Sequence, residues 1–383
     1  MFPDYNSPDL HLAHPTPEEK LATWNLNYEE WGKALSKSDY LHREQYLASV
    51  PLTSEDGITY WCLVDKSAPP NNREIYASCE SLRKKAFISK EGKVEEVIIH
   101  SIGSVFCPPK NRGRKYASRM MTDLGNILKT WQLDPNIPGR QKTPASILFS
   151  DIGKKFYANH GWHPFPSSHI SLLPLPNPAD SPSSHLITLL KEEDLPPLCD
   201  LDTTYIRQVL SRANDHKTHI ALLPDYPTIQ WHHLRENVMS VSIFGRAPEI
   251  KGALVGSPGS RVWAYWTRGY YGPVNSPSSG NCLHILRLVL EDESNSAANA
   301  EKLEAVLREA QREASEWKMN EVQFWNPTAL VEDLLNRSEL GEKGIHRKVE
   351  REEESVASLM WYGEGEGTVE EVEWWGNEKY GWC

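Results

Sequence analysis

The stretch SVFCPPKNRGRKYASRMM, residues 104–121, connects an apolar strand to an amphipathic helix. The strand that we expect over residues 94–107 ends at two consecutive prolines, which cannot donate hydrogen bonds to a neighbouring strand. Over residues 113–131 apolar side chains then recur mostly at spacings of three and four, which predicts a helix with one face in a core. The order strand, short turn, Arg-Gly and helix is the local arrangement that decides the fold.

The start of this helix is suited to binding a polyanion. Its first turn has unpaired amides and the positive end of the helix dipole, and Gly113 lets a ligand approach the backbone closely. Arg112, Arg114 and Lys115 add positive charge at the end where it disfavours the helix itself. One interpretation is a basic surface turn. The functional interpretation is a pyrophosphate held by the backbone of residues 112–117.

A second segment, SDIGKKFYANHGW at residues 150–162, follows an apolar strand expected over residues 145–149. A helix is predicted over residues 151–160, and Gly161 ends it as a C-terminal cap would. Tyr157 on this helix is either a packing residue beside Phe156 or a functional phenol.

The Pro- and Ser-rich residues 172–185 are the predicted linker between two domains, residues 1–171 and 186–383. The first half predicts helices over residues 17–35 and 38–50, then meandering strands over 58–64, 75–87 and 94–107. The second half predicts strands over residues 238–244, 261–270, 284–290 and 321–325, a helix whose apolar stripe runs from Leu303 to Trp317, and a short helix over 328–335. The two halves therefore look like copies of one architecture.

The bulk properties describe a globular chain of 383 residues. No apolar run approaches the length of a membrane span, and the first residues lack a basic start followed by an apolar core, so we expect a cytoplasmic protein with no membrane contact. The formal net charge of −11 argues against binding to nucleic acid. The six cysteines have no metal-ligand spacing, so no metal site is expected.

These two segments resemble the motifs of the GNAT superfamily of N-acetyltransferases. In the superfamily's loop, Arg or Gln is followed by two residues, Gly, one residue, and Gly or Ala; Arg112, Lys115 and Ala117 occupy these places, with Lys115 replacing the middle glycine. The resemblance implies an α+β fold with mixed sheets in two tandem GNAT-like domains, with acetyl-CoA as the cofactor. It also implies that Tyr157 protonates the departing CoA thiolate. The acetyl-CoA contacts that it implies are Val105, Phe106, Cys107, Arg112, Gly113, Arg114, Lys115, Tyr116, Ala117 and Ser118.

The reaction also needs a base, because an alkyl amine with a reference pKa of about 10.4 is protonated at neutral pH. Glu80 and Glu96 lie on the expected strands, and His100 lies mid-strand before the loop. A fourth candidate is the terminal carboxylate of Cys383, by analogy with tandem GNAT-like N-myristoyltransferases. The sequence leaves the choice among these groups open.

The second half has EDESNSAANAEK, residues 291–302, where the first half has its Arg-Gly loop, and acidic side chains there would repel a pyrophosphate. We therefore expect a degenerate, non-catalytic copy. Its aromatic residues form either a core or part of an acceptor pocket: Trp263, Tyr265, Trp266, Tyr270 and Tyr271.

The segments CESLR at residues 79–83, SVFCPPKNRGRKYA and NEKYGW at 377–382 resemble the fungal lysine N6-acetyltransferases that begin lysine degradation. That resemblance implies acetylation of the side-chain amine of free L-lysine by direct attack of the amine on the thioester. The alternatives are acetylation of another amine, such as a polyamine or a protein lysine, and an inactive CoA-binding module that holds partners.

Overall fold

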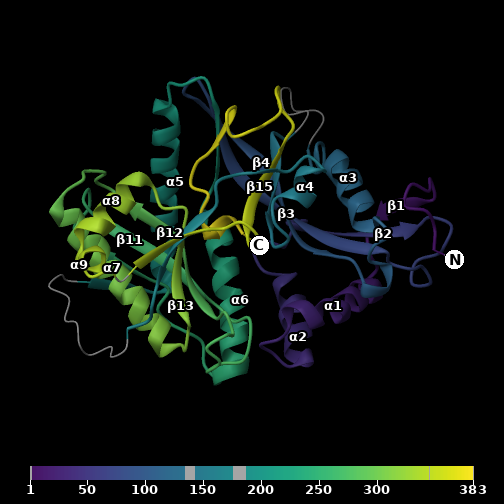
Figure 1. The fold of residues 1–383 in the computed structure, drawn as a ribbon, viewed down its shortest axis with the longest axis horizontal. Helices are drawn as coiled ribbons and strands as arrows, with labels where there is room; N and C mark the ends of the chain where they lie inside the picture. The colour runs from purple at the N-terminus through teal and green to yellow at the C-terminus, as the bar shows by residue number, and fades with distance from the viewer. Residues whose placement is uncertain (1, 134–142, 176–186, 345, 383) are drawn as a thin grey trace.

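The strands form two mixed sheets, one in each half of the molecule (Figure 1). The computed structural model describes residues 2–133, 143–175, 187–344 and 346–382. Helices cover both sheets, and the N-terminus lies at the far edge of the first half, whereas the C-terminal segment ends between the halves (Figure 1). Two sheets with flanking helices confirm the predicted α+β class and the two tandem domains.

The first half has four α-helices and seven strands within the described residues. The helices are α1 (Pro17–Trp31), α2 (Lys37–Leu47), α3 (Tyr116–Leu128) and α4 (Lys155–Ala158), and the strands are β1 (Leu10–Ala13), β2 (Ile58–Asp65), β3 (Ala77–Lys90), β4 (Lys93–Phe106), β5 (Ala145–Ser150), β6 (His163–Pro164) and β7 (Ser168–Leu172). The predicted elements of this half are confirmed, although α4 is one turn where the sequence predicted ten residues.

In the second half, the structure has five α-helices and nine strands among the described residues. The helices are α5 (Leu195–Arg212), α6 (Tyr226–Phe244), α7 (Ala297–Glu316), α8 (Ala329–Arg337) and α9 (Glu339–Glu342), and the strands are β8 (Ile187–Leu190), β9 (Thr218–Leu222), β10 (Gly252–Val255), β11 (Val262–Gly269), β12 (Cys282–Leu290), β13 (Glu321–Trp325), β14 (His346–Glu350), β15 (Val356–Trp361) and β16 (Val372–Trp374).

The predicted strand over residues 238–244 is wrong, because these residues are the last two turns of helix α6. Asp225 caps the start of α6 by accepting a hydrogen bond from the amide of Thr228, and Gly245 ends the helix with φ +72°. The β-branched residues near its end favour a strand only in isolation; a capped helix that packs on α2 and β11 overrides that preference.

The two sheets exchange strands, so they do not divide the chain at the predicted linker. The first sheet runs β1-β2-β3-β4-β5-β15-β6, with β9 on β3 and β16 on β9, and the second runs β14-β7-β13-β12-β11-β10-β8. Strand β7 thus precedes the predicted linker but lies in the second sheet, whereas β15 comes from the end of the chain and lies between β5 and β6. The chain therefore passes from one sheet to the other more than once, so the two halves are not connected by a single linker.

Helix α3 packs its apolar face on the first sheet. Its buried residues Met120, Met121, Leu124 and Leu128 contact a core that also contains Trp162. Burial of each such side chain contributes roughly 1.5–3 kcal/mol to the free energy of folding. Since this face fixes the rotation of α3 about its axis, it also fixes where the first turn of α3 points.

The C-terminal segment lies between the two halves (Figure 1), where buried polar contacts hold it. Arg287 of β12 pairs with both Asp202 of α5 and Glu378. The hydroxyl of Tyr380, which is fully buried, donates to the Leu222 carbonyl, and Lys84 Nζ donates to the Gly381 carbonyl at 2.9 Å. These contacts bring Trp382 against α6 near the boundary between the halves.

Candidate active site

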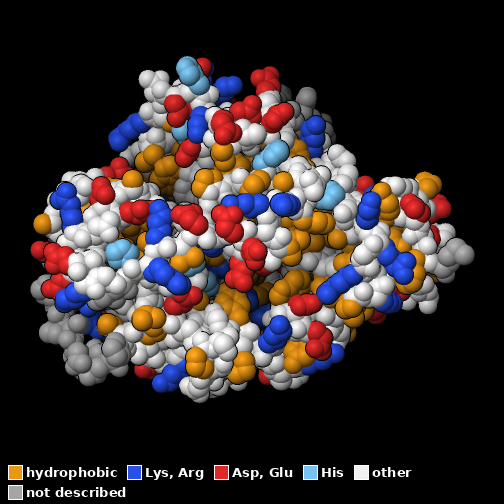
Figure 2. Space-filling view, in the orientation of Figure 1, with side chains coloured by type: hydrophobic (Ala, Val, Ile, Leu, Met, Phe, Trp, Pro, Cys, Tyr) orange, Lys and Arg blue, Asp and Glu red, His pale blue; other side chains and the backbone are white. Residues whose placement is uncertain are grey.

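A cavity of about 800 Å³ lies where the two halves meet. Its walls come from α1, α2, β4, β5 and α4 of the first half, from α6 of the second half, and from Trp382. Figure 2 shows hydrophobic side chains deep in a hollow near the middle of this face, with acidic side chains around its rim. Both halves therefore contribute to the cavity, which the sequence analysis left open.

A β-bulge in β4 forms one wall of the cavity. Ser78 pairs with Phe106 and Glu80 with Gly103, so Ser104 and Val105 together stand opposite Cys79. Ser104 adopts φ +52°, a left-handed conformation that is strained for any residue other than glycine. Such strain is concentrated at functional sites because the surrounding structure must hold it in place. The bulge turns the backbone of residues 103–106 toward the cavity.

Strands β4 and β5 separate next to this bulge. Their parallel pairing runs from His100–Ser146 to Ile102–Leu148 and then stops. Beyond Ile102 the β5-facing edge of β4 has no strand partner, and an unpaired edge presents free amides and carbonyls to a ligand. The cavity is lined on this edge by Val105, Phe106 and Cys107, and on β5 by Leu148 and Phe149. The gap is thus suited to an extended arm with amide groups.

The first turn of α3 opens onto the end of this gap. Lys115 is the N-terminal cap residue with φ +62°, and no side chain caps the helix. In the described part of the chain, the amides of residues 113–118 have no protein acceptor. Gly113 has φ +76°, and a Cβ placed there would meet no atom within 4 Å, so the space above it is open. Uncapped amides at the positive end of a helix form an anion site.

The corresponding helix of the second half lacks this feature. Ser296 caps α7 by accepting a hydrogen bond from the amide of Asn299, and the side chain of Asn299 donates in turn to the carbonyls of Asp292 and Ser294. The first turn of α7 is therefore occupied by protein groups and surrounded by acidic residues. Of these two helices, only α3 therefore presents free amides to an anion.

The side chains of the loop lie in several directions. Arg112 donates to the Cys107 carbonyl at 3.1 Å and pairs with Glu30 of α1 at 2.9 Å, which ties the loop to α1. The guanidinium of Arg114 lies 3.8 Å from the ring centroid of Phe2. Tyr116 is 1% exposed and its hydroxyl donates to the Pro3 carbonyl, so only its backbone, and not its ring, is available to a ligand.

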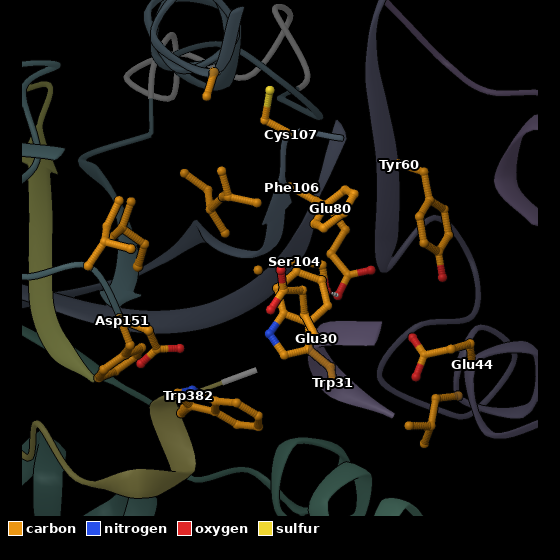
Figure 3. Close-up of a pocket in the computed structure, with 18 of the residues that line it drawn as sticks. Glu30, Trp31, Glu44, Tyr60, Glu80, Ser104, Phe106, Cys107, Asp151 and Trp382 are labelled. Carbon is orange, nitrogen blue, oxygen red and sulfur yellow. Dashed lines mark hydrogen bonds between the residues drawn. The ribbon is translucent and has the colours of Figure 1, made fainter. Parts of the chain in front are cut away.

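Glu80 points into the cavity beside the bulge (Figure 3). Ser104 Oγ donates to Glu80 Oε1 at 2.9 Å. Burial and the charge of Glu44 raise the pKa of Glu80 to about 7, although the hydrogen bond from Ser104 and the charge of Arg43 oppose the rise. A carboxylate with a pKa close to neutrality is suited to accept a proton from an amine and to release it again.

Tyr157 lines the cavity from α4. It is 7% exposed, its ring contacts Phe156 edge to face, and its hydroxyl has no protein partner among the described residues. Burial raises the pKa of this phenol above its usual value, and the nearby Cys79 and Asp151 act in the same direction. The phenol therefore keeps its proton at neutral pH and can donate a hydrogen bond into the cavity.

The other candidate bases lie elsewhere. His100 is fully buried outside the cavity lining, its ring nitrogen Nε2 donates to Gln132 Oε1 at 3.1 Å, and burial lowers its pKa to about 4. Glu96 lies on the surface, 3.8 Å from Arg207. Cys383 lies outside the described residues.

Several cavity residues were missed by the sequence analysis. They are Glu30 and Trp31 of α1, Tyr40, Arg43 and Glu44 of α2, Tyr60 of β2, and Trp231 and Arg235 of α6. Figure 3 shows Trp31, Tyr60, Glu44 and Trp382 directed into the same space as Glu80. Among the aromatic residues proposed for the second half, Trp263, Tyr265, Trp266 and Tyr270 are fully buried in the core and only Tyr271 lines the cavity.

Two further findings concern ligands and membranes. Across the part of the chain that the structure describes, no group of three His, Cys, Asp or Glu side chains is arranged to hold a metal ion. No helix within the same residues is both long and apolar enough to cross a bilayer.

Comparisons with known proteins agree with the fold. The chain is 24% identical over 420 residues to an uncharacterized protein of Saccharomyces cerevisiae, covering 100% of both chains. It is 25% identical over 291 residues to a lysine acetyltransferase of Yarrowia lipolytica, covering 67% of this chain and 71% of that protein.

Solved structures share the fold at low sequence identity. A GCN5-related N-acetyltransferase from Anabaena variabilis matches with a TM-score of 0.51 at 14% identity, over 91% of this chain and 72% of that chain. An N-myristoyltransferase of Saccharomyces cerevisiae with bound myristoyl-CoA matches with a TM-score of 0.51 at 8% identity, over 93% of this chain and 80% of that chain.

The model of the LYC1 GNAT-like C-terminal domain matches residues 169–383, which is more than half of the sequence. The matched region includes the second sheet, α6 and the C-terminal segment that reaches the cavity. The first half contains the bulged strand β4, the separated strands β4 and β5, and the uncapped helix α3. The chain therefore belongs to the family of the LYC1 GNAT-like C-terminal domain and is a GNAT-type N-acetyltransferase.

Proposed function

We propose that this enzyme transfers the acetyl group of acetyl-CoA to the N6 amine of free L-lysine, at one site built mainly from the first half. GNAT enzymes move an acyl group from an acyl-CoA to an amine. The finer assignment is supported by the similarity to a lysine acetyltransferase of Yarrowia lipolytica and by the acidic groups Glu80 and Glu44 in the cavity. It would place the enzyme at the start of lysine degradation, in the cytoplasm.

The proposed donor site follows from the free backbone groups. The amides of residues 113–118 would hold the pyrophosphate, and the unpaired edge at Val105, Phe106 and Cys107 would pair with the pantetheine arm. Lys115 places a positive charge near the first turn of α3. A glycine there would carry no charge but would let the phosphate come closer to the backbone. The volume between β4 and β5 is lined by apolar groups that suit an acetyl group.

The proposed base is Glu80. Its pKa of about 7 means that it is largely ionised at slightly alkaline pH and can take a proton from the lysine ammonium, whose reference pKa is about 10.4. The neutral amine then attacks the thioester carbon. The carbon–sulfur bond breaks as the carbon–nitrogen bond forms, and backbone amides of the bulge at residues 104–106 stabilise the negative charge on the carbonyl oxygen.

Tyr157 is proposed to act on the leaving sulfur. Because its pKa is raised, full transfer of its proton to a thiolate with a reference pKa of about 8.5 is uphill. The hydroxyl therefore stabilises the developing thiolate chiefly through a donated hydrogen bond, and any proton that it does give is replaced from solvent. Glu80 releases the first proton to solvent through the open cavity, and the ionised carboxylate then accepts the proton that the nitrogen loses as the carbon–sulfur bond breaks.

The single observation that carries this proposal is a carboxylate, Glu80, placed beside a strained bulge at the point where two strands separate. The test is thiol release from acetyl-CoA by the purified full-length protein with L-lysine, spermidine, 1,5-diaminopentane and a lysine-containing peptide. The proposal expects the highest kcat/KM with L-lysine. A higher value with spermidine or the peptide would move the acceptor to that class, and no release with any amine would remove the enzymatic proposal.

A further inference from the structure

Arg235 is a charged residue of the second half that faces the cavity from α6. Among the described residues it forms no ion pair and no hydrogen bond with the protein. Four arginines are buried among the described residues; Arg351 donates to the Ser168 carbonyl and lies over the ring of Trp325, outside the cavity, and the other three pair with carboxylates. Arg43 pairs with Glu44, Arg268 with Glu236 and Glu313, and Arg287 with Asp202 and Glu378. Arg235 therefore differs from these three in lacking an anion.

The surroundings of Arg235 make this absence costly. Burial and, to a smaller extent, the charge of Arg43 on helix α2 together lower the pKa of its guanidinium to about 10. The charge of Glu44 also acts on Arg235, but Glu44 already accepts hydrogen bonds from Nε and Nη2 of Arg43. The ring of Trp382 lies 5.7 Å away and gives Arg235 a partial cation–π contact, which does not neutralise the charge. A carboxylate ligand would supply the counter-ion that this desolvated guanidinium lacks.

The cavity thus presents two opposite charges to one ligand. Glu80 of β3 is the acidic group beside the bulge, and Arg235 of α6 is the unpaired basic group from the other half of the molecule. Aromatic walls, including Trp31 and Trp231, supply apolar surface for methylene groups. Because Glu30, Glu44 and Asp151 also line the cavity, the discrimination lies at Arg235 itself: a second ammonium placed against this guanidinium is repelled, whereas a carboxylate is attracted.

We propose that Arg235 binds the carboxylate of the acceptor, so that the site takes amino acids with a terminal amine rather than diamines. This inference rests on the proposed acetyltransferase function and adds the group that selects the acceptor. A planar guanidinium can hold a carboxylate through two parallel hydrogen bonds, which fixes the orientation of the chain that carries it. The second half then contributes to acceptor binding although it holds no acyl donor.

The test compares L-lysine with 1,5-diaminopentane, which is lysine without its carboxylate, in the wild-type protein and in Arg235→Gln. The expected result is a fall of at least about 30-fold in kcat/KM for L-lysine, as for loss of one partner of a buried charge pair. The kcat/KM for 1,5-diaminopentane is expected to stay within about threefold or to rise, since one repelling charge is removed. Arg246→Gln is the matched control, because Arg246 pairs with Glu316 on the surface just beyond the same helix.

A parallel loss for both acceptors in Arg235→Gln would show a structural role and overturn the inference. Unchanged kinetics with L-lysine would overturn it as well. If the wild-type protein acetylates no amine, the proposed function fails, and calorimetric titration of L-lysine in the presence of CoA still decides the inference. Binding to the wild-type protein that is lost in Arg235→Gln and kept in Arg246→Gln supports it, whereas no binding to the wild-type protein contradicts it.

Discussion

Ser104 donates a hydrogen bond of 2.9 Å to Glu80 across the β-bulge in the pairing of β3 with β4. The left-handed backbone of Ser104 creates the bulge, and the side chain of the same residue tunes the carboxylate. One strained residue therefore couples the backbone of the proposed oxyanion site to the proposed base.

Replacing Glu80 tests the base. In Glu80→Gln the side chain keeps its size and can still accept from Ser104, but it cannot take a proton from the ammonium. We expect kcat to fall by about 100- to 10 000-fold, the usual contribution of a general base. Steady-state kinetics with L-lysine checks this, with Glu96→Gln as a control on the surface of β4. Full turnover in Glu80→Gln would remove Glu80 from the mechanism.

The pH dependence follows from the same residue. Glu80 acts as a base only when ionised, and its pKa is about 7. The value of kcat/KM should therefore fall about tenfold per pH unit below that pKa. In Ser104→Ala the pKa rises, because a hydrogen bond that lowers it is lost, so the acidic limb should move to higher pH. An unmoved limb in Ser104→Ala would assign that limb to another group.

A substitution at Ala117 can test the proposed pyrophosphate site without lowering the stability of the fold. Ala117 is in the first turn of α3, where a carboxylate favours the helix dipole but repels a phosphate. Ala117→Asp should keep or raise the melting temperature while raising the KM for acetyl-CoA by at least about tenfold, a Coulomb penalty of more than 1.4 kcal/mol. Ala117→Asn is the neutral control of similar shape. Equal KM values in the two variants would contradict the assignment.

Tyr157→Phe removes the hydroxyl and keeps the buried ring beside Phe156. If this hydroxyl stabilises the thiolate only as it forms, kcat should fall by about 10- to 1000-fold with little change in either KM. Single-turnover kinetics measures the chemical step directly. A normal chemical step in Tyr157→Phe would leave this tyrosine as a packing residue.

The start of α1 depends on a buried ion pair between Glu19 and Arg73. Glu19 completes a capping box with Thr16, and both of its oxygens accept hydrogen bonds from Arg73. Glu19→Ala should reduce the free energy of unfolding by about 3–5 kcal/mol, because it leaves Arg73 buried without its partner. Chemical denaturation measures the change, with the exposed neighbour in Glu18→Ala as the control. Equal stability of the two variants would contradict this role.

The same ion pair predicts a dependence of stability on pH. The hydrogen bonds from Arg73 lower the pKa of Glu19 to about 2, below its ordinary value of 4.5. A carboxylate with a lowered folded-state pKa stabilises the fold above its unfolded-state pKa and loses that effect as pH falls toward the folded-state value. The stability difference between the wild-type protein and Glu19→Gln should therefore shrink between pH 4.5 and 2.

The backbone arrangement on the donor side of the proposed site was predictable because its signals are local. A strand stopped by prolines, a glycine and an amphipathic period are properties of neighbouring residues, and the structure has β4, an open turn at Gly113 and α3 in that order. The bulge at Ser104 was not predicted. Its formation depends on the register of β4 against β3, which no local pattern encodes.

The acceptor side of the proposed site was not predictable because, like the bulge, it depends on contacts between residues that are far apart in the sequence. Arg235 and Trp231 lie on a helix whose end was predicted as a strand, from the β-branched residues before Gly245. The start signals, Asp225 as a cap and Pro227 in the first turn, were present in the sequence and identify the helix when read together. Arg235 and Trp231 line the same cavity as Glu80 because the two sheets exchange strands, and only the complete fold determines that exchange.

The most direct test of the central claim is to incubate the purified protein with acetyl-CoA labelled with ¹³C in the acetyl group and with free L-lysine, and to locate the label by NMR. The account predicts stoichiometric CoA release with the acetyl group on N6, and loss of the product in Glu80→Gln. Label on the α-amine, or no acetylated lysine while acetyl-CoA still binds, would contradict it.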